Sequence, residues 1–210
     1  MSRYSTPGIE GQYQPGSDEQ VLANILGITG PEKMDEVELG LLDQLYETVF
    51  ADVLEDQSLT VSDLKKWHRM WLGNVYEWAG AERSVNMSKP GFTFAASVQI
   101  PQLLEGFESN FLKKYTPCNG FTEDRLVEAI AAVHVEFILI HPYREGNGRL
   151  SRLLANVMAL QAGWPELDFS LFDEHKEYYF KSIQAGVDGD LSYLERLVKD
   201  TLRLSRNDKS

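Results

Sequence analysis

The chain has 210 residues, of which 43% are hydrophobic and 25% are charged, values typical of a single globular domain with a full core. Its 32 acidic residues against 20 basic ones give a net charge of −12, which disfavours nonspecific binding to nucleic acid or to anionic membranes. No apolar run has the length of a membrane span, the first residues carry no secretory pattern, and a single cysteine excludes an intramolecular disulfide. We therefore expect a soluble, cytoplasmic protein.

The first residues differ in composition from the rest. Residues 1–16 hold three glycines and two prolines with few aliphatic side chains, which predicts a flexible N-terminal arm ahead of one domain over residues 17–210. Within the arm, Thr6-Pro7-Gly8-Ile9-Glu10-Gly11 has a helix cap, a proline at the first helical position and a glycine stop. At most one helical turn is expected there.

Hydrophobic spacing predicts three helices before the middle of the chain. A short amphipathic helix is expected over residues 20–28 and a longer one over residues 34–54. The third is expected to begin at a cap on Thr60 or Ser62 and to continue to Gly80. Its buried side should carry Trp67, Trp71, Val75 and Trp78.

The helical period breaks over residues 83–96, where alternating β-branched and aromatic residues surround Lys89-Pro90-Gly91. This pattern predicts a small β-hairpin. Further helices are expected over residues 98–114, 122–140, 149–162, 173–186 and 191–204. The predicted fold class is therefore all-α, with about eight helices and one hairpin.

Residues 141–152 join two of these helices. Pro142 disfavours helical geometry at the residue before it and so ends the apolar helix, while Gly146 and Gly148 can adopt the positive φ of a tight turn. Successive backbone N–H groups in such a turn, together with the dipole of the helix that begins near Gly148, suit a phosphate. The segment is therefore predicted to hold an anion.

Side chains in the same segment add a base, a metal ligand and positive charge. Arg149 and Arg152 lie three residues apart on one helical face, and their guanidinium groups suit the outer phosphates of a nucleotide. Phosphates would repel Glu145 unless a cation lay between them, which favours a role as a Mg²⁺ ligand. His141 titrates near neutrality and could take a proton from an incoming hydroxyl, and Asn147 can tie the loop to itself. Each feature alone is more often structural, so the combination carries the hypothesis.

At these residues the sequence resembles the Fic family, whose signature is His-x-Phe-x-Asp/Glu-Gly-Asn-Gly-Arg-x-x-Arg. The match is complete except that Tyr143 replaces the phenylalanine, which packs beneath the loop in the family. The run Trp78-Ala79-Gly80 followed by Arg83 is also similar to Fic proteins. The resemblance implies a Fic-type helical bundle with a small β-hairpin flap beside the active site. His68, in the same upstream run, is expected to be a packed structural residue.

The resemblance further implies protein adenylylation: transfer of AMP from ATP to a Ser, Thr or Tyr hydroxyl of a target protein, with release of pyrophosphate. In that reaction His141 takes the hydroxyl proton and Glu145 holds Mg²⁺. Tyr179 is the residue that similarity to the family suggests for the nucleobase contact. The flap, residues 84–96, would bind the target segment by strand addition.

The resemblance also assigns the polyphosphate contacts. Gly146, Asn147 and Gly148 would cradle the phosphates, and Arg149 and Arg152 would clamp the β- and γ-phosphates. Positioning and charge stabilisation carry most of the catalysis in such reactions.

The arm matches the Fic inhibitory motif, Ser/Thr-x-x-x-Glu-Gly/Asn, in which Glu10 would pair with Arg152 and block productive ATP binding. Pro7 and Gly8 weaken a helix there, so an ordinary flexible arm is the alternative. If Glu10 is not inhibitory, a separate small antitoxin protein could supply the blocking glutamate, and this chain would be the toxin half of a toxin-antitoxin pair.

Other chemistries stay open at this stage. Relatives that use other donors transfer UMP, phosphocholine or phosphate, and the phosphate-transferring branch has lysine where this chain has Gly146, which favours nucleotidyl transfer. Removal of AMP from a modified protein would need Glu10 to align a water molecule. The non-enzymatic alternative is a nucleotide-binding module with a silent motif.

Overall fold

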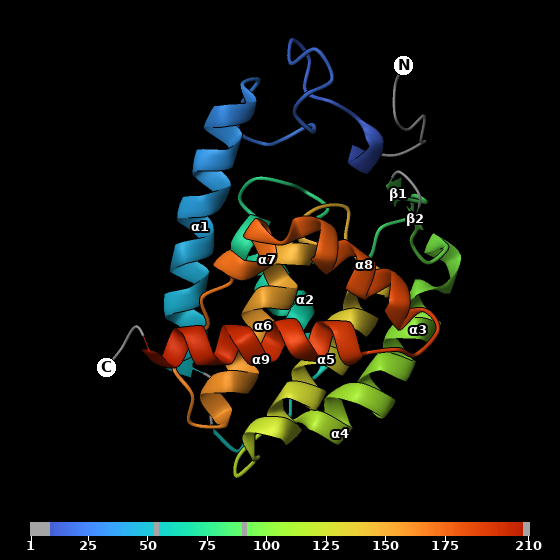
Figure 1. Ribbon diagram of the computed structural model, residues 1–210. Helices are drawn as coiled ribbons and strands as arrows, with labels where there is room; N and C mark the ends of the chain where they lie inside the picture. Colours follow the sequence, from blue (N-terminus) through green and yellow to red (C-terminus); the bar gives the residue numbers. More distant parts are fainter. Residues whose placement is uncertain (1–8, 53–54, 90–91, 208–210) are drawn as a thin grey trace.

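The computed structural model describes residues 9–52, 55–89 and 92–207, and within them helices dominate (Figure 1). The prediction of an all-α fold with one hairpin is confirmed. The helices are α1 (Pro31–Asp52), α2 (Val61–Leu72), α3 (Ile100–Phe107), α4 (Lys113–Tyr115), α5 (Glu123–Ile140), α6 (Asn147–Gln161), α7 (Ser170–Glu174), α8 (Lys176–Gly186) and α9 (Ser192–Asn207). The strands β1 (Ser88–Lys89) and β2 (Phe92–Thr93) pair antiparallel, with Lys89 opposite Phe92.

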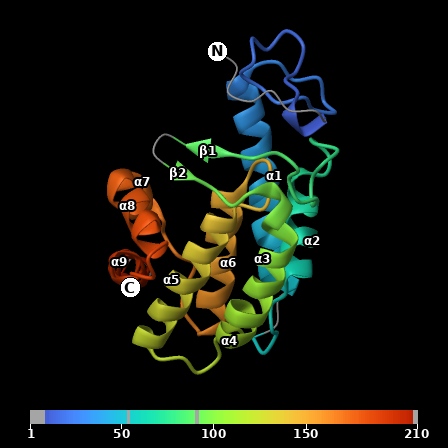
Figure 2. The same ribbon diagram turned by 90° about the vertical axis from the view of Figure 1, so that its right-hand side faces the viewer.

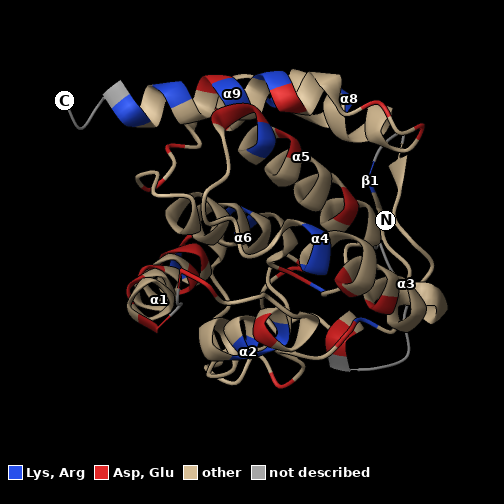
Figure 3. Ribbon diagram, turned by 90° about the horizontal axis from the view of Figure 1, so that it is seen from below, with Lys and Arg blue, Asp and Glu red and all other residues tan. Residues whose placement is uncertain are grey.

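The centre of the fold is the pair α5 and α6. Figure 2 shows them side by side, with α7, α8 and α9 on one flank and α1, α2 and α3 on the other. The view from below in Figure 3 agrees, with α9 and α2 at opposite edges of the molecule. α5 is buried on most faces because its sequence from Leu126 onward is mostly apolar, as predicted for the segment before the motif.

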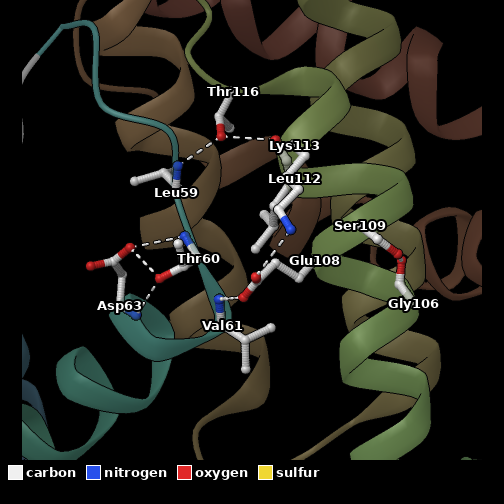
Figure 4. A network of polar contacts seen from close by, with 10 residues as sticks. All are labelled: Leu59, Thr60, Val61, Asp63, Gly106, Glu108, Ser109, Leu112, Lys113 and Thr116. Carbon is white, nitrogen blue, oxygen red and sulfur yellow. Dashed lines mark hydrogen bonds and ion pairs between the residues drawn. The ribbon is translucent and has the colours of Figure 1, made fainter.

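The start of α2 is fixed by a polar network (Figure 4). Thr60 caps the helix: its hydroxyl accepts from the Asp63 N–H at 3.2 Å, and the Asp63 carboxylate accepts from the Thr60 N–H at 2.8 Å. Glu108 lies in a π-helical turn (Glu108–Leu112) between α3 and α4, and its carboxylate accepts from the Val61 N–H at 2.9 Å. This hydrogen bond joins the start of α2 to the segment between α3 and α4.

Two helix predictions were wrong in extent or type. No helix forms over residues 20–28, because the Asn24 side chain binds backbone instead, accepting from the Ile28 N–H at 2.9 Å and donating to the Ile28 carbonyl at 2.8 Å. The helix expected to continue to Gly80 ends at Leu72, followed by Gly73, and residues 73–80 form successive turns.

Two other elements match the prediction with local changes. The helix predicted over residues 98–114 is present but contains the π turn, and the one over residues 173–186 is divided at His175, which lies outside helical geometry at φ −105° and ψ 40°. Among the described residues, no helix is both long enough and apolar enough to cross a membrane.

Candidate active site

The bend between α5 and α6 carries the motif. α5 ends at His141, which adopts the left-handed conformation at φ 50° and ψ 60°. Asn147 ties the bend to itself, as predicted: its side-chain oxygen accepts from the Tyr143 N–H at 2.9 Å, and its amide donates to the Tyr143 carbonyl at 2.7 Å. The loop is thereby closed directly ahead of the N-terminus of α6, where unpaired N–H groups and the helix dipole favour an anion.

Gly146 is required by this turn. It caps α6 at φ 81°, and a Cβ atom there would lie 2.6 Å from Cζ3 of Trp71. Gly148 differs, because it is within the helix and a Cβ atom would meet no atom within 4 Å. The first glycine therefore allows the turn to form, whereas the second leaves open space at the helix N-terminus.

The floor of the bend is aromatic. Tyr143 is 1% exposed and stacks on His68, with ring centroids 4.0 Å apart, so the tyrosine occupies the buried place expected of the family's phenylalanine. His68 accepts from the Gly80 N–H at 2.8 Å through Nδ1, which leaves Nε2 to donate to the Glu145 carbonyl at 3.1 Å. Burial lowers the pKa of His68 to about 4, so the ring is neutral. The expected structural role of His68 is confirmed.

His141 stands at the entrance to the bend in the protonation state that a base needs. Its Nδ1 lies 3.3 Å from the Ile138 carbonyl, and a carbonyl can only accept, so the proton is on Nδ1 and the lone pair is on Nε2. The Phe94 ring stacks on the imidazole, with the two ring centroids 3.8 Å apart. Burial first, and then the positive charges of Lys89 and Arg83, lower the pKa of His141 to about 3.

Glu145 offers a carboxylate at the start of α6. It accepts from the Gly146 N–H at 2.8 Å and from Arg149 at 3.2 Å, and its side chain is 44% exposed. Among the described residues, no cluster of three His, Cys, Asp or Glu side chains could hold a metal ion. One accessible carboxylate fits Mg²⁺, which commonly takes one or two protein carboxylates and completes its shell with phosphate oxygens and water.

Arg149 is held by a residue that the sequence analysis missed. Glu38 on α1 is 3% exposed; its carboxylate pairs with Arg149 at 2.7 Å and accepts from the Tyr76 hydroxyl at 2.7 Å. The Trp71 indole donates to the Glu38 carbonyl at 2.8 Å, and the Arg149 guanidinium lies 4.6 Å from the centre of the same indole. The guanidinium is thus fixed in place.

A signal for Glu38 was present in the sequence. The buried positions of α1 are Met34, Glu38, Leu42, Leu45 and Val49, and an acidic residue within such an apolar stripe needs a buried partner.

Arg152 makes a two-pronged ion pair with Asp173 on α7, at 2.7 Å and 3.0 Å. Tyr179 lies in the same neighbourhood, but its hydroxyl is 2.9 Å from Nε2 of the buried His134 and its ring packs against Phe172. Any contact of Tyr179 with a ligand would therefore use the ring and not the hydroxyl. A phosphate on Arg152 would have to replace Asp173.

Glu10 lies in a short helical turn (Ile9–Gly11), away from the partner predicted for it. Its carboxylate accepts from the Ser84 N–H at 2.8 Å and from the Ser84 hydroxyl, and its carbonyl accepts from Arg144 at 2.8 Å. The ion pair between Glu10 and Arg152 that the inhibitory motif would imply does not form in this structure, where Arg152 pairs with Asp173. Arg144 of the motif thus contacts this N-terminal turn.

Replacing Glu38 by glutamine is expected to lower the free energy of unfolding by about 1–3 kcal/mol, because Arg149 would lose its buried carboxylate while the hydrogen bond from Tyr76 is kept. Urea denaturation measures this. Glu36→Gln is the matched control on the same helix, since Glu36 pairs with Lys33 and its side chain is 71% exposed. Equal urea midpoints of unfolding for Glu38→Gln and Glu36→Gln would contradict a structural role for Glu38.

The fold and the bend together define a helical domain with a tight loop between its two central helices and a hairpin beside it. Residues 58–159 match the family model described as Fic/DOC family. The chain is 25% identical over 199 residues to the protein adenylyltransferase Fic of Drosophila ananassae. That alignment includes 94% of this chain, and the chain spans 39% of the length of the relative.

Solved structures agree on the fold. The N-terminal Fic domain of a Bartonella effector protein, from Bartonella sp. AR 15-3, superposes with a TM-score of 0.76 at 21% identity, over 94% of this chain and 93% of that one. BepC from Bartonella tribocorum, solved with bound AMPPNP, superposes with a TM-score of 0.72 at 22% identity, over 91% of this chain and 96% of that one. The chain therefore contains a Fic domain, which the family model matches over residues 58–159.

Proposed function

We propose that the chain is a protein adenylyltransferase, which transfers AMP from ATP to a hydroxyl side chain of a target protein. The observation that carries the proposal is the contact of His141 Nδ1 with the Ile138 carbonyl at 3.3 Å, beside the N-terminus of α6. A proton on Nδ1 satisfies that carbonyl and leaves the lone pair of Nε2 available as a base next to a helix end that favours phosphate. The names of the relatives, protein adenylyltransferase Fic, point to the same reaction.

The proposed step is an in-line displacement at the α-phosphorus of ATP. The hydroxyl oxygen of the target forms a bond to the α-phosphorus as its proton passes to Nε2 of His141. The bond between the α-phosphorus and the oxygen that bridges the α- and β-phosphates breaks. Pyrophosphate leaves with the electron pair. The N–H groups of Asn147 and Gly148 bind phosphate oxygens, and that of Gly146 joins them once it leaves the Glu145 carboxylate. Arg149, and Arg152 once it leaves Asp173, neutralise the outer phosphates.

We propose that Glu145 holds Mg²⁺ together with those phosphates, where the ion neutralises charge and orients the polyphosphate. Tyr179 would contact the nucleobase with its ring. The flap, residues 84–96, would bind an extended segment of the target by strand addition, since β1 and β2 form a two-stranded sheet with open edges.

The test is labelling of lysate proteins with ATP carrying ³²P at the α-phosphate, with ATP labelled at the γ-phosphate in parallel. AMP transfer labels proteins from the α position only. Label from the γ position would indicate phosphate transfer, and stronger labelling from α-labelled UTP would indicate UMP transfer. ATP binding by calorimetry without label on any protein would favour the silent module.

Deleting residues 1–16 separates the roles of Glu10. Autoinhibition predicts faster transfer by the shortened chain, AMP removal predicts lost hydrolysis of an AMP-modified protein, and a passive arm predicts no change in either rate. Glu10→Ala in the full chain is the matched variant. If neither change alters transfer, a separate antitoxin protein remains the proposed source of an inhibitory glutamate, and co-purification from the native host tests for it.

A further inference from the structure

Arg83 is a buried cation outside the motif that contacts the bend through its backbone. Its side chain is 2% exposed, and its Nε donates to the His141 carbonyl at 2.6 Å. Nη2 donates to the Ile140 carbonyl at 3.2 Å, and the N–H of Arg83 donates to the Pro142 carbonyl at 2.8 Å. Three consecutive carbonyls around the catalytic histidine are thus bound by one residue.

The same guanidinium binds both ends of the flap. Nη1 donates to the Val85 carbonyl ahead of β1 at 2.6 Å, and Nη2 donates to the Ala95 carbonyl after β2 at 2.7 Å. The Ala95 N–H in turn donates to the Leu139 carbonyl of α5 at 3.2 Å. Because Phe94 adjoins Ala95, its ring is brought onto the imidazole of His141 by this anchoring.

Two physical conditions favour a cation at this point. The last carbonyls of α5 have no partner within the helix, and a positive charge near a helix C-terminus is favourable. His141 also adopts a left-handed conformation, which a residue with a side chain keeps only when its surroundings enforce it. The planar fork of an arginine satisfies several carbonyls in fixed directions, which the single ammonium of a lysine cannot do.

We propose that Arg83 is a positioning residue for the transfer reaction: it locks the backbone of His141 and the base of the flap together, and so sets the distance between the imidazole and the hydroxyl of a target bound to the flap. The inference rests on the proposed function. Arg83 reaches none of the residues assigned to the polyphosphate, so its loss should leave ATP binding intact and slow the transfer itself.

The experiment compares Arg83→Met and Arg83→Lys with Arg203→Met, a control on α9 whose side chain is 59% exposed. For both Arg83 variants we expect kcat for transfer to fall about 10- to 100-fold, with the lysine variant less affected, while the Kd for ATP with Mg²⁺ changes less than about threefold. Circular dichroism at the assay temperature identifies the variants that are folded. If the methionine variant is unfolded, the kcat and Kd of the lysine variant alone test the proposal.

A double-mutant cycle distinguishes positioning from general damage to the fold. If Arg83 acts through His141, then adding Arg83→Lys to His141→Ala should lower the remaining transfer rate less than twofold. An equal loss in both backgrounds, a parallel loss of ATP affinity, or an unchanged kcat would each overturn the proposal. A wild-type chain that labels no protein from α-labelled ATP would instead refute the proposed function, so the two failures are distinguishable.

Discussion

Replacing His141 by alanine is expected to lower AMP transfer by about 10²- to 10⁴-fold, the usual cost of losing a general base. The ATP site should persist, because the side chain of His141 is not among the proposed phosphate contacts. Calorimetry with ATP and Mg²⁺ should therefore give a Kd close to that of the wild type. His141→Asn is the companion variant, since asparagine tolerates the left-handed backbone at φ 50° that alanine strains.

The pH dependence of the wild type provides a second test of His141. A pKa of about 3 in the free protein means that the imidazole is already neutral throughout the working range, so kcat/KM should stay level as the pH falls from 8 to 6. Bound polyphosphate adds negative charge near the ring, which favours the imidazolium and raises its pKa. The acid limb of kcat should then lie at higher pH than that of kcat/KM.

A base elsewhere would give a different result. If kcat/KM fell with a midpoint near 6.5, the ordinary value for histidine, an exposed imidazole would be implied. Unchanged labelling by His141→Ala would remove the residue from its proposed role.

Local chemistry in the motif could be predicted from the sequence because it depends on neighbours in the chain. The closure of the bend by Asn147 and the positive φ of Gly146 follow from residue type over a few positions. The same holds for the cap at Thr60, whose carboxylate partner lies three residues away. In such cases the contacting atoms are fixed by the backbone geometry of a turn or a helix start.

The residues that the sequence analysis missed act across long distances in the chain. Glu38 meets Arg149 from another helix, and Phe94 meets His141 through the flap. Arg83 could be noted by its resemblance to Fic proteins, but its contacts with two segments depend on tertiary packing. The helix predicted over residues 20–28 is absent for a local reason: the Asn24 side chain forms hydrogen bonds with nearby backbone groups, and these compete with a helix.

Gly146→Ala is expected to lower the free energy of unfolding by about 2–5 kcal/mol, the combined cost of a left-handed alanine and of overpacking. The new Cβ atom would lie 2.6 Å from the Trp71 ring. That ring has little freedom to move: Trp71 is fully buried, its indole donates to the Glu38 carbonyl, and Arg149 covers one face. The turn must therefore shift, and with it the N-terminus of α6.

Two other glycine substitutions separate this effect from the loss of a glycine as such. Gly40 on α1 is exposed and a Cβ atom there would meet nothing within 4 Å, so Gly40→Ala should stabilise the protein by about 0.5–1 kcal/mol. Gly148→Ala should also keep the fold, because its Cβ position is open, yet weaken ATP binding if phosphate occupies that space. Urea midpoints with ATP calorimetry measure both quantities. Equal stability of Gly146→Ala and Gly148→Ala would show that the close approach to Trp71 does not constrain the bend.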